Sequence, residues 1–84
     1  MKIVWTKHAE DRQKEWEKKL EITRQEVENM IRCPEQIVPG DQHTLVAQSR
    51  RGNGLLRVAF GDIGGERKIL TLYWTSKVQK YWKE

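Results

Sequence analysis

The stretch from Leu55 to Ser76 places three polar side chains on one face of a predicted β-hairpin. Arg57 in the first strand, and Thr71 and Tyr73 in the second, alternate with mostly apolar or small residues. Successive strand side chains point to opposite faces, so the three share a face unless the register slips by one residue. Arginine suits a phosphate group because its N–H donors match two oxygens at once. Arg57 is therefore a candidate phosphate-binding residue, with a structural salt bridge as the alternative; Tyr73 is either a catalytic phenol or a packing aromatic.

His8 and Arg12 form a second pair of candidates, four residues apart on a helix predicted for residues 7–19. This spacing makes them neighbours on one flank of the helix, and the alternative is that both are ordinary surface residues. Histidine can act as base or acid near neutral pH. Imidazole, guanidinium and phenol groups together suit metal-free cleavage of RNA by its own 2′-hydroxyl. That reaction needs a base, an acid and fixed positive charge beside the phosphorane.

The positive charge of this 84-residue chain is concentrated in its second half. The formal net charge is +4, and no acidic residue lies between Gln42 and Gly61, where Arg50, Arg51 and Arg57 fall. This distribution favours an anionic partner such as RNA, DNA or an acidic protein, although solubility alone could explain it. If RNA binds, we expect phosphate contacts from three basic residues outside the reacting centre: Arg50, Arg51 and Lys77.

Other kinds of site find little support in the sequence. His8, Cys33 and His43 lack the spacing of zinc ligands, and the glycines of residues 61–65 lack the lysine of a phosphate-binding loop. No serine or cysteine triad is indicated, and we expect neither a metal nor a cofactor. The single cysteine excludes an internal disulfide, and with no membrane-spanning run or signal peptide it predicts a cytoplasmic protein. We expect Cys33 to be a small buried residue.

Local signals define a single domain with two helices in its first half. Residues 2–5 predict a short strand, and Thr6 can cap the helix that follows. Thr23 and Glu26 form a capping box for a second helix, which Pro34 ends. Ile22 and Val27 are placed to form a hydrophobic staple across that cap.

The second half predicts three consecutive antiparallel strands joined by glycine turns, beginning at residues 45–49. A further two-residue strand at 37–38 is an open alternative. Ser76 and Gln79 predict a capping box for a closing helix, whose stripe of Val78, Tyr81 and Trp82 faces the core. The expected order is β-α-α-β-β-β-α, an α+β fold. One sheet face is wholly apolar and must be covered by the helices; its residues are Leu56, Val58, Phe60, Leu70, Leu72 and Trp74.

Five short stretches of the chain carry a resemblance to a known group of proteins. They are Thr6–Ala9 with Arg12, Glu26–Ile31, Cys33–Glu35, Leu56–Val58 and Leu70–Trp74. In this order they resemble a widespread, mostly uncharacterised group of small bacterial domains that is similar in fold to the RelE/ParE toxin superfamily, including BrnT-type toxins. The resemblance implies an α+β domain, residues 1–84, with a curved antiparallel sheet covered by helices on one face. It also implies mRNA cleavage, free or on the ribosome, restrained by an antitoxin.

The resemblance also implies roles for individual residues. His8 and Arg12 match the histidine and arginine of the family's first helix, and Arg57 matches the arginine of its central strand. The first hypothesis is therefore a metal-free endoribonuclease, with Arg57 stabilising the phosphate, His8 as acid or base, and Arg12, Tyr73 and Lys77 assisting. Many RelE-type toxins place a catalytic Tyr or His near the C-terminus, whereas this chain offers Tyr81 and Trp82 on a stripe expected to face the core.

Two other hypotheses stay open because one fold supports several activities. The second hypothesis is a non-catalytic module that binds RNA or a partner protein through the same face. The third is an interaction domain that binds no nucleic acid.

Overall fold

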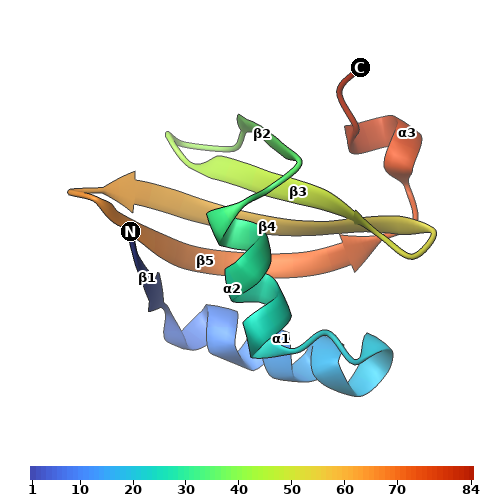
Figure 1. Ribbon diagram of the computed structural model, residues 1–84, viewed down its shortest axis with the longest axis horizontal. Coiled ribbons are helices and arrows are strands. Elements are labelled where there is room, and N and C mark those ends of the chain that lie inside the picture. The colour runs from blue at the N-terminus through green and yellow to red at the C-terminus, as the bar shows by residue number, and fades with distance from the viewer.

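Five strands form one mixed sheet in the order β1-β5-β4-β3-β2 (Figure 1). The computed structural model describes residues 1–84. Its elements are β1 (Lys2–Trp5), α1 (Lys7–Leu20), α2 (Arg24–Arg32), β2 (Gln36–Pro39), β3 (Leu45–Arg51), β4 (Gly54–Ile63), β5 (Glu66–Thr75) and α3 (Val78–Tyr81). The α+β class is confirmed. None of the three helices has the length and apolar character needed to span a bilayer.

The sheet differs from the expected one in two respects. The prediction of a wholly antiparallel sheet is wrong, because β1 pairs with β5 in parallel. A parallel pair requires a long crossover, and here α1, α2 and the strands β2 to β4 separate the two partners. The predicted order also lacked a strand: Gln36–Pro39 pairs with β3 as a fourth consecutive strand. The remaining pairs, β2 with β3, β3 with β4 and β4 with β5, are antiparallel as expected.

Both N-terminal helices begin at the residues that the sequence indicated. The Thr6 hydroxyl accepts from the Ala9 N–H at 3.1 Å, and the Thr23 hydroxyl accepts from the Glu26 N–H at 3.1 Å. The capping box of Thr23 and Glu26 is only half formed, because the Glu26 carboxylate instead accepts from Arg51 Nε at 2.7 Å. Helix α2 ends at Arg32, and its C-cap residue Cys33 is exposed, so the expectation of a buried cysteine is wrong.

The face of the sheet that carries Leu56, Val58 and Phe60, here called the first face, is covered by α1 and α2. These three residues are at most 1% exposed. Ala9 of α1 packs against them, as do Ile22, which precedes α2, and Val27 within α2. Residues of the neighbouring strands complete the cluster. The core cluster consists of Ala9, Ile22, Val27, Met30, Ile31, Ala47, Leu56, Val58, Phe60, Ile69 and Leu72. Apolar burial of this kind is the main source of stability in so small a domain.

A β-bulge in β5 changes which residue faces this core. The register passes from Ala59 opposite Thr71 to Phe60 opposite Ile69, which leaves Leu70 without a partner on β4. Ile69 is fully buried, whereas Leu70 is only half-buried. The prediction that Leu70 belongs to the apolar face is therefore wrong, because an extra residue in one strand reverses the alternation beyond it. Thr71 and Tyr73 lie on the C-terminal side of the bulge in β5, on the same face as Arg57.

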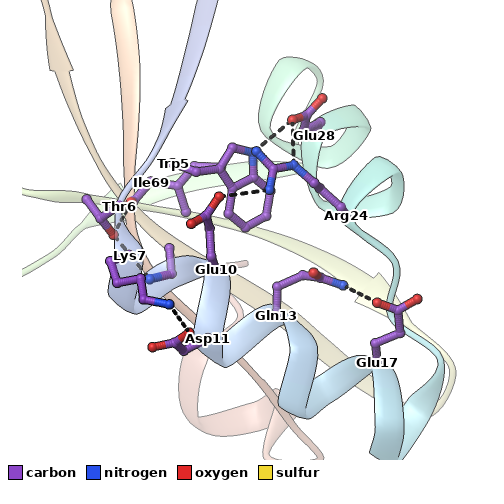
Figure 2. A network of polar contacts seen from close by, with 11 residues as sticks. Trp5, Thr6, Lys7, Glu10, Asp11, Gln13, Glu17, Arg24, Glu28 and Ile69 are labelled. Carbon is purple, nitrogen blue, oxygen red and sulfur yellow. Dashed lines mark hydrogen bonds and ion pairs between the residues drawn. The ribbon is translucent and has the colours of Figure 1, made fainter.

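Polar contacts fix α2 against β1 and α1 (Figure 2). The Trp5 indole N–H donates to Glu28 Oε2 at 2.8 Å, and the Arg24 guanidinium lies over the Trp5 ring at 4.5 Å. Arg24 also donates to Glu10 on α1 at 3.1 Å. These contacts join three elements at the rim of the core, where exposed ion pairs add little stability.

The C-terminal segment lies on the other side of the sheet. Helix α3 has a single turn, its N-cap is Lys77, and no side chain caps it, so the predicted capping box of Ser76 and Gln79 is wrong. A helix this short cannot form alone in water, and its place is set by contacts with the sheet. Since Tyr81 contacts Arg57, which alternates with the core residues of β4, the helices do not all cover one face. The expected stripe of Val78, Tyr81 and Trp82 does not join the main core.

Candidate functional site

Gln48, Arg57 and Tyr73 form a row across three adjacent strands. In the register, Arg57 of β4 is paired with Gln48 of β3 on one side and with Tyr73 of β5 on the other. Directly paired residues project from the same face of a sheet. This row therefore lies on the face turned away from α1 and α2, here called the second face.

The guanidinium of Arg57 is held in place from three directions. Its Nε donates to Gln48 Oε1 at 2.9 Å, and its Nη1 donates to the Tyr73 hydroxyl. The Tyr81 ring covers the guanidinium at 4.0 Å from Cζ. The eight ion pairs of the structure do not include Arg57, so this half-buried cation has no carboxylate partner. It is oriented by neutral groups and keeps N–H donors free.

Gln48 is the residue that fixes this arrangement, and sequence reasoning did not select it. Its side chain is fully buried, its Oε1 accepts from Arg57, and its Nε2 donates to Gln36 Oε1 at 2.7 Å and to the Tyr81 carbonyl at 2.9 Å. A buried amide with all these partners has one orientation. The Gly52-Asn53 turn could have identified Gln48 from the sequence, because a two-residue turn sets the β3–β4 register and so places Gln48 opposite Arg57.

The C-terminal segment contributes two aromatic rings to the second face. The Lys83 N–H donates to Gln36 Oε1 at 3.1 Å, and the Gln36 amide donates back to the Lys83 carbonyl. The Arg50 guanidinium lies over the Trp82 ring at 4.5 Å. These contacts hold Tyr81 and Trp82 beside the basic residues of β3 and β4.

The two tyrosines of the second face have pKa values displaced in opposite directions. Burial raises the pKa of Tyr73 above its ordinary value of 10.0, although the hydrogen bond from Arg57 opposes the rise. The Tyr81 ring stands edge-on to that of Tyr73, with centroids 6.4 Å apart. The pKa of Tyr81 is lowered, chiefly by the Tyr73 side chain and further by Lys80. Tyr73 is thus favoured as the proton-bearing phenol and Tyr81 as the one that ionises first.

A pocket of about 290 Å³ opens beside Arg57 and Tyr73. Its remaining lining residues come from the loop between β2 and β3 and from the floor of the sheet: Pro39, Gly40, Asp41, Thr44, Val46 and Ala59. The pocket therefore adjoins the row of three polar residues and has an apolar bottom.

The structure brings together two of the four residues that were predicted to be catalytic. Arg57 and Tyr73 are in contact. His8 and Arg12 belong to α1, which packs on the first face, and no hydrogen bond or ion pair joins either of them to Arg57 or Tyr73. Arg12 donates to Glu15 at 3.1 Å, and His8 is exposed. The catalytic roles of these two residues stay predictions, but the four do not form one cluster.

The three predicted phosphate contacts divide in the same way. The Arg51 guanidinium is occupied by Glu26 and by the Leu20 carbonyl, to which it donates at 2.9 Å. Arg50 lies over Trp82 and has no ion pair, and Lys77 is exposed at the start of α3. Arg50 and Lys77 are therefore free to meet a ligand, whereas Arg51 closes the end of α1.

No group of three or more His, Cys, Asp or Glu side chains in the structure is placed to hold a metal ion. A scan against models of protein families finds no match to the chain, and searches of curated proteins and of solved structures find none either. The RelE/ParE resemblance therefore rests on the sequence motifs alone.

Proposed function

We propose that this protein binds RNA through the second face, with Arg57 as a phosphate contact. The observation that carries the proposal is a half-buried guanidinium that is fixed by Gln48 and Tyr73 yet lacks a carboxylate partner. Withdrawing a charge from water is costly unless an opposite charge compensates. A phosphate would supply that charge and accept from the free N–H donors.

The surroundings of Arg57 suit a single-stranded nucleic acid. Arg50, Lys77 and Lys80 are exposed near the same end of the molecule, and Lys80 Nζ lies 5.2 Å from the centre of the Tyr81 ring. Proteins that bind single strands combine such cations with aromatic rings on which bases stack. Tyr81 and Trp82 would provide those rings. The +4 net charge adds a favourable long-range attraction.

A toxin-type ribonuclease is the second candidate, and the opposite pKa displacements of Tyr73 and Tyr81 favour it. Two titratable groups with pKa values pushed apart are suited to act as acid and base. In this mechanism Tyr81, as phenolate, takes the 2′-hydroxyl proton, and the 2′-oxygen attacks phosphorus. The bond from phosphorus to the 5′-oxygen breaks, and that oxygen takes the Tyr73 proton. Arg57 stabilises the phosphorane, and the products are a 2′,3′-cyclic phosphate and a 5′-hydroxyl.

The hydrogen bonding of Tyr73 is compatible with that role. Its hydroxyl oxygen accepts from Arg57, and its own proton, which stabilises the Tyr81 phenolate, would pass to the leaving group once Tyr81 has taken the 2′-proton. This arrangement assigns no proton transfer to His8. An antitoxin-like protein that covered the second face would restrain such an activity, as the resemblance to RelE/ParE-type toxins implies.

RNA binding can be tested by fluorescence anisotropy with a labelled single-stranded RNA. We expect Arg57→Met to weaken binding by about tenfold or more, because a charge-assisted hydrogen bond contributes roughly 1.5–3 kcal/mol. The slope of log affinity against log salt should fall by about 1. Arg32→Met, which removes the same charge from α2, is the matched control and should change affinity less than twofold. Equal affinities for the two variants would refute the proposal.

Cleavage can be tested separately by incubating RNA with the protein in the presence of a chelator. We expect a 2′,3′-cyclic phosphate product, loss of activity in Tyr73→Phe and Tyr81→Phe, and full activity in His8→Ala. Loss of activity in His8→Ala alone would indicate that His8 of α1, and not Tyr81, is the catalytic base. Binding without cleavage, together with normal bacterial growth after induction of the protein, would leave a binding module and exclude the toxin.

A further inference from the structure

The pocket beside Arg57 also carries an unpaired negative charge. Asp41 and Arg57 both line it, but they form no ion pair, so their charged atoms are more than 4.0 Å apart. Asp41 is exposed, forms no ion pair with any other residue, and its carboxylate accepts no hydrogen bond within the chain. The pocket thus offers a free carboxylate and a free guanidinium to one ligand.

The floor of the pocket, where it is formed by the sheet, carries small and apolar side chains. Val46 and Ala59 are paired across β3 and β4, and both line the pocket with Tyr73. The small side chain of Ala59 leaves the space open. A planar ring can lie on such a floor next to an aromatic wall.

The position of Asp41 is set by its backbone and leaves its carboxylate free. The Asp41 carbonyl accepts from the Thr44 N–H at 3.0 Å and from the Thr44 hydroxyl. The Gly40 N–H donates to the Thr44 carbonyl at 2.9 Å, which closes the loop. The turn therefore does not need the side chain of Asp41.

We infer that this pocket holds the guanine base of a nucleotide whose phosphate lies on Arg57, an inference that rests on the proposed binding of RNA by the second face. A carboxylate offers two acceptor oxygens and no donor. Guanine presents two adjacent donors, N1–H and the 2-amino group, which can pair with both oxygens. Adenine, cytosine and uracil place an acceptor beside their donor on that edge and would leave one oxygen unpaired.

The size of the pocket agrees with a single nucleotide. Its volume of about 290 Å³ lies just below the range of roughly 300–1,000 Å³ for small-molecule sites, as a ligand smaller than most requires. The same chemistry fits a guanosine within RNA and a free guanine nucleotide. These two sources are separated by experiment.

Calorimetric titration with GMP, IMP, AMP and UMP tests the base directly. IMP lacks only the 2-amino group, so we expect GMP to bind at least about tenfold more tightly than IMP. Asp41→Asn should abolish this difference, because an amide offers one acceptor in place of two. Asparagine is well tolerated in turns, so the variant should fold. Asp11→Asn on α1 removes the same charge from the opposite side of the molecule and should keep the difference. Equal binding of GMP and IMP would overturn the inference.

The same variants with short RNAs separate this inference from the proposed function. We expect a guanosine-containing RNA to bind more tightly than oligouridine, and Asp41→Asn to remove that preference while oligouridine binding persists. If Arg57→Met weakens all RNAs and Asp41→Asn changes nothing, the protein binds RNA and the guanine pocket is refuted. If no RNA binds but GMP does, with the expected loss in Asp41→Asn, the pocket serves a free nucleotide and the RNA proposal fails.

Discussion

The two faces of the sheet are covered by different kinds of contact: apolar packing on the first face and polar contacts on the second. On the first face Leu56, Val58 and Phe60 are buried beneath two helices in an apolar cluster, and the Arg67 guanidinium lies over the Phe60 ring at 4.8 Å. On the second face Arg57 and Tyr73 are half-buried beneath a one-turn helix and are bonded to polar neighbours. Burial on the first face is favourable in itself, whereas burial of a cation on the second is favourable only with partners. The first face therefore stabilises the fold, whereas the second face carries a cation with no acidic partner, which is the basis of the proposed RNA binding.

The arginines illustrate the same contrast. Arg51 and Arg67, at the edges of the first face, each pair with an acid and donate to the last carbonyls of a helix: Arg51 to Leu20 and Arg67 to Ile31. Both satisfy groups that a helix end leaves unpaired. Arg57 makes neither kind of contact. Arg51 and Arg67 therefore have acidic partners within the fold, whereas Arg57 has none.

The largest expected effect is the loss of stability when a large buried side chain is removed from the first face. Phe60 is fully buried, and Phe60→Ala should lower the free energy of unfolding by about 3–5 kcal/mol, measured by urea denaturation. Ile63 lies in the same strand but is 68% exposed, so Ile63→Ala should change it by less than about 0.5 kcal/mol. Similar losses in the two variants would contradict the assignment of the core to this face.

Adjacent arginines give the next largest effect. Arg51→Met should cost about 1–3 kcal/mol, because it leaves Glu26 and the Leu20 carbonyl without their donor, whereas Arg50→Met should be near neutral for stability. RNA affinity should respond in the reverse order, with a loss in Arg50→Met alone. Thermal unfolding measures the stability of both variants, and fluorescence anisotropy measures their affinity for RNA. A stability loss confined to Arg50→Met would contradict the assignment of the stabilising role to Arg51.

A smaller effect is expected from the polar contacts that join the helices. Arg24 pairs with Glu10 at 3.1 Å and Glu28 at 3.6 Å, but its side chain is 50% exposed (Figure 2). Arg24→Met should cost only about 0.3–1 kcal/mol in urea denaturation, and the cost should shrink in high salt. A loss as large as that of Arg51→Met would mean that this network supports the fold more than its exposure suggests.

The smallest expected effect is the separate ionisation of Tyr81 and Tyr73, which is observable only in alkaline solution. In an absorbance titration of the phenols, Tyr81 should ionise below 10.0 and Tyr73 above it, and Tyr81→Phe should remove the lower step. Because its pKa is lowered on folding, Tyr81 raises stability as pH rises from its folded pKa to 10.0; Tyr73, whose pKa is raised, lowers stability above 10.0. A single shared step near 10.0 would remove the basis for assigning acid and base.

The features that could be predicted from the sequence are those with local causes. Thr6 and Thr23 begin their helices because a hydroxyl satisfies an N–H three residues away. The alternation of β4 places Arg57 opposite to the core whichever strands are its neighbours. The Gly52-Asn53 turn sets the register with β3. From such features the α+β class and the placement of Arg57 on the face opposite to the core could be predicted, whereas its direct pairing with Tyr73 depends on the bulge in β5.

The remaining features depend on contacts between distant segments, and only the tertiary structure decided them. The bulge at Leu70 reversed the face of Ile69, and the pairing of Arg51 with Glu26 joined residues 25 positions apart. The docking of Tyr81 on Arg57 depends on hydrogen bonds that Gln36 and Gln48 make with the C-terminal segment. The sequence by itself determined which side chains alternate and where helices begin, because these depend on neighbouring residues. It could not determine which distant groups compete successfully for each donor and acceptor, since that depends on the packing of the whole chain.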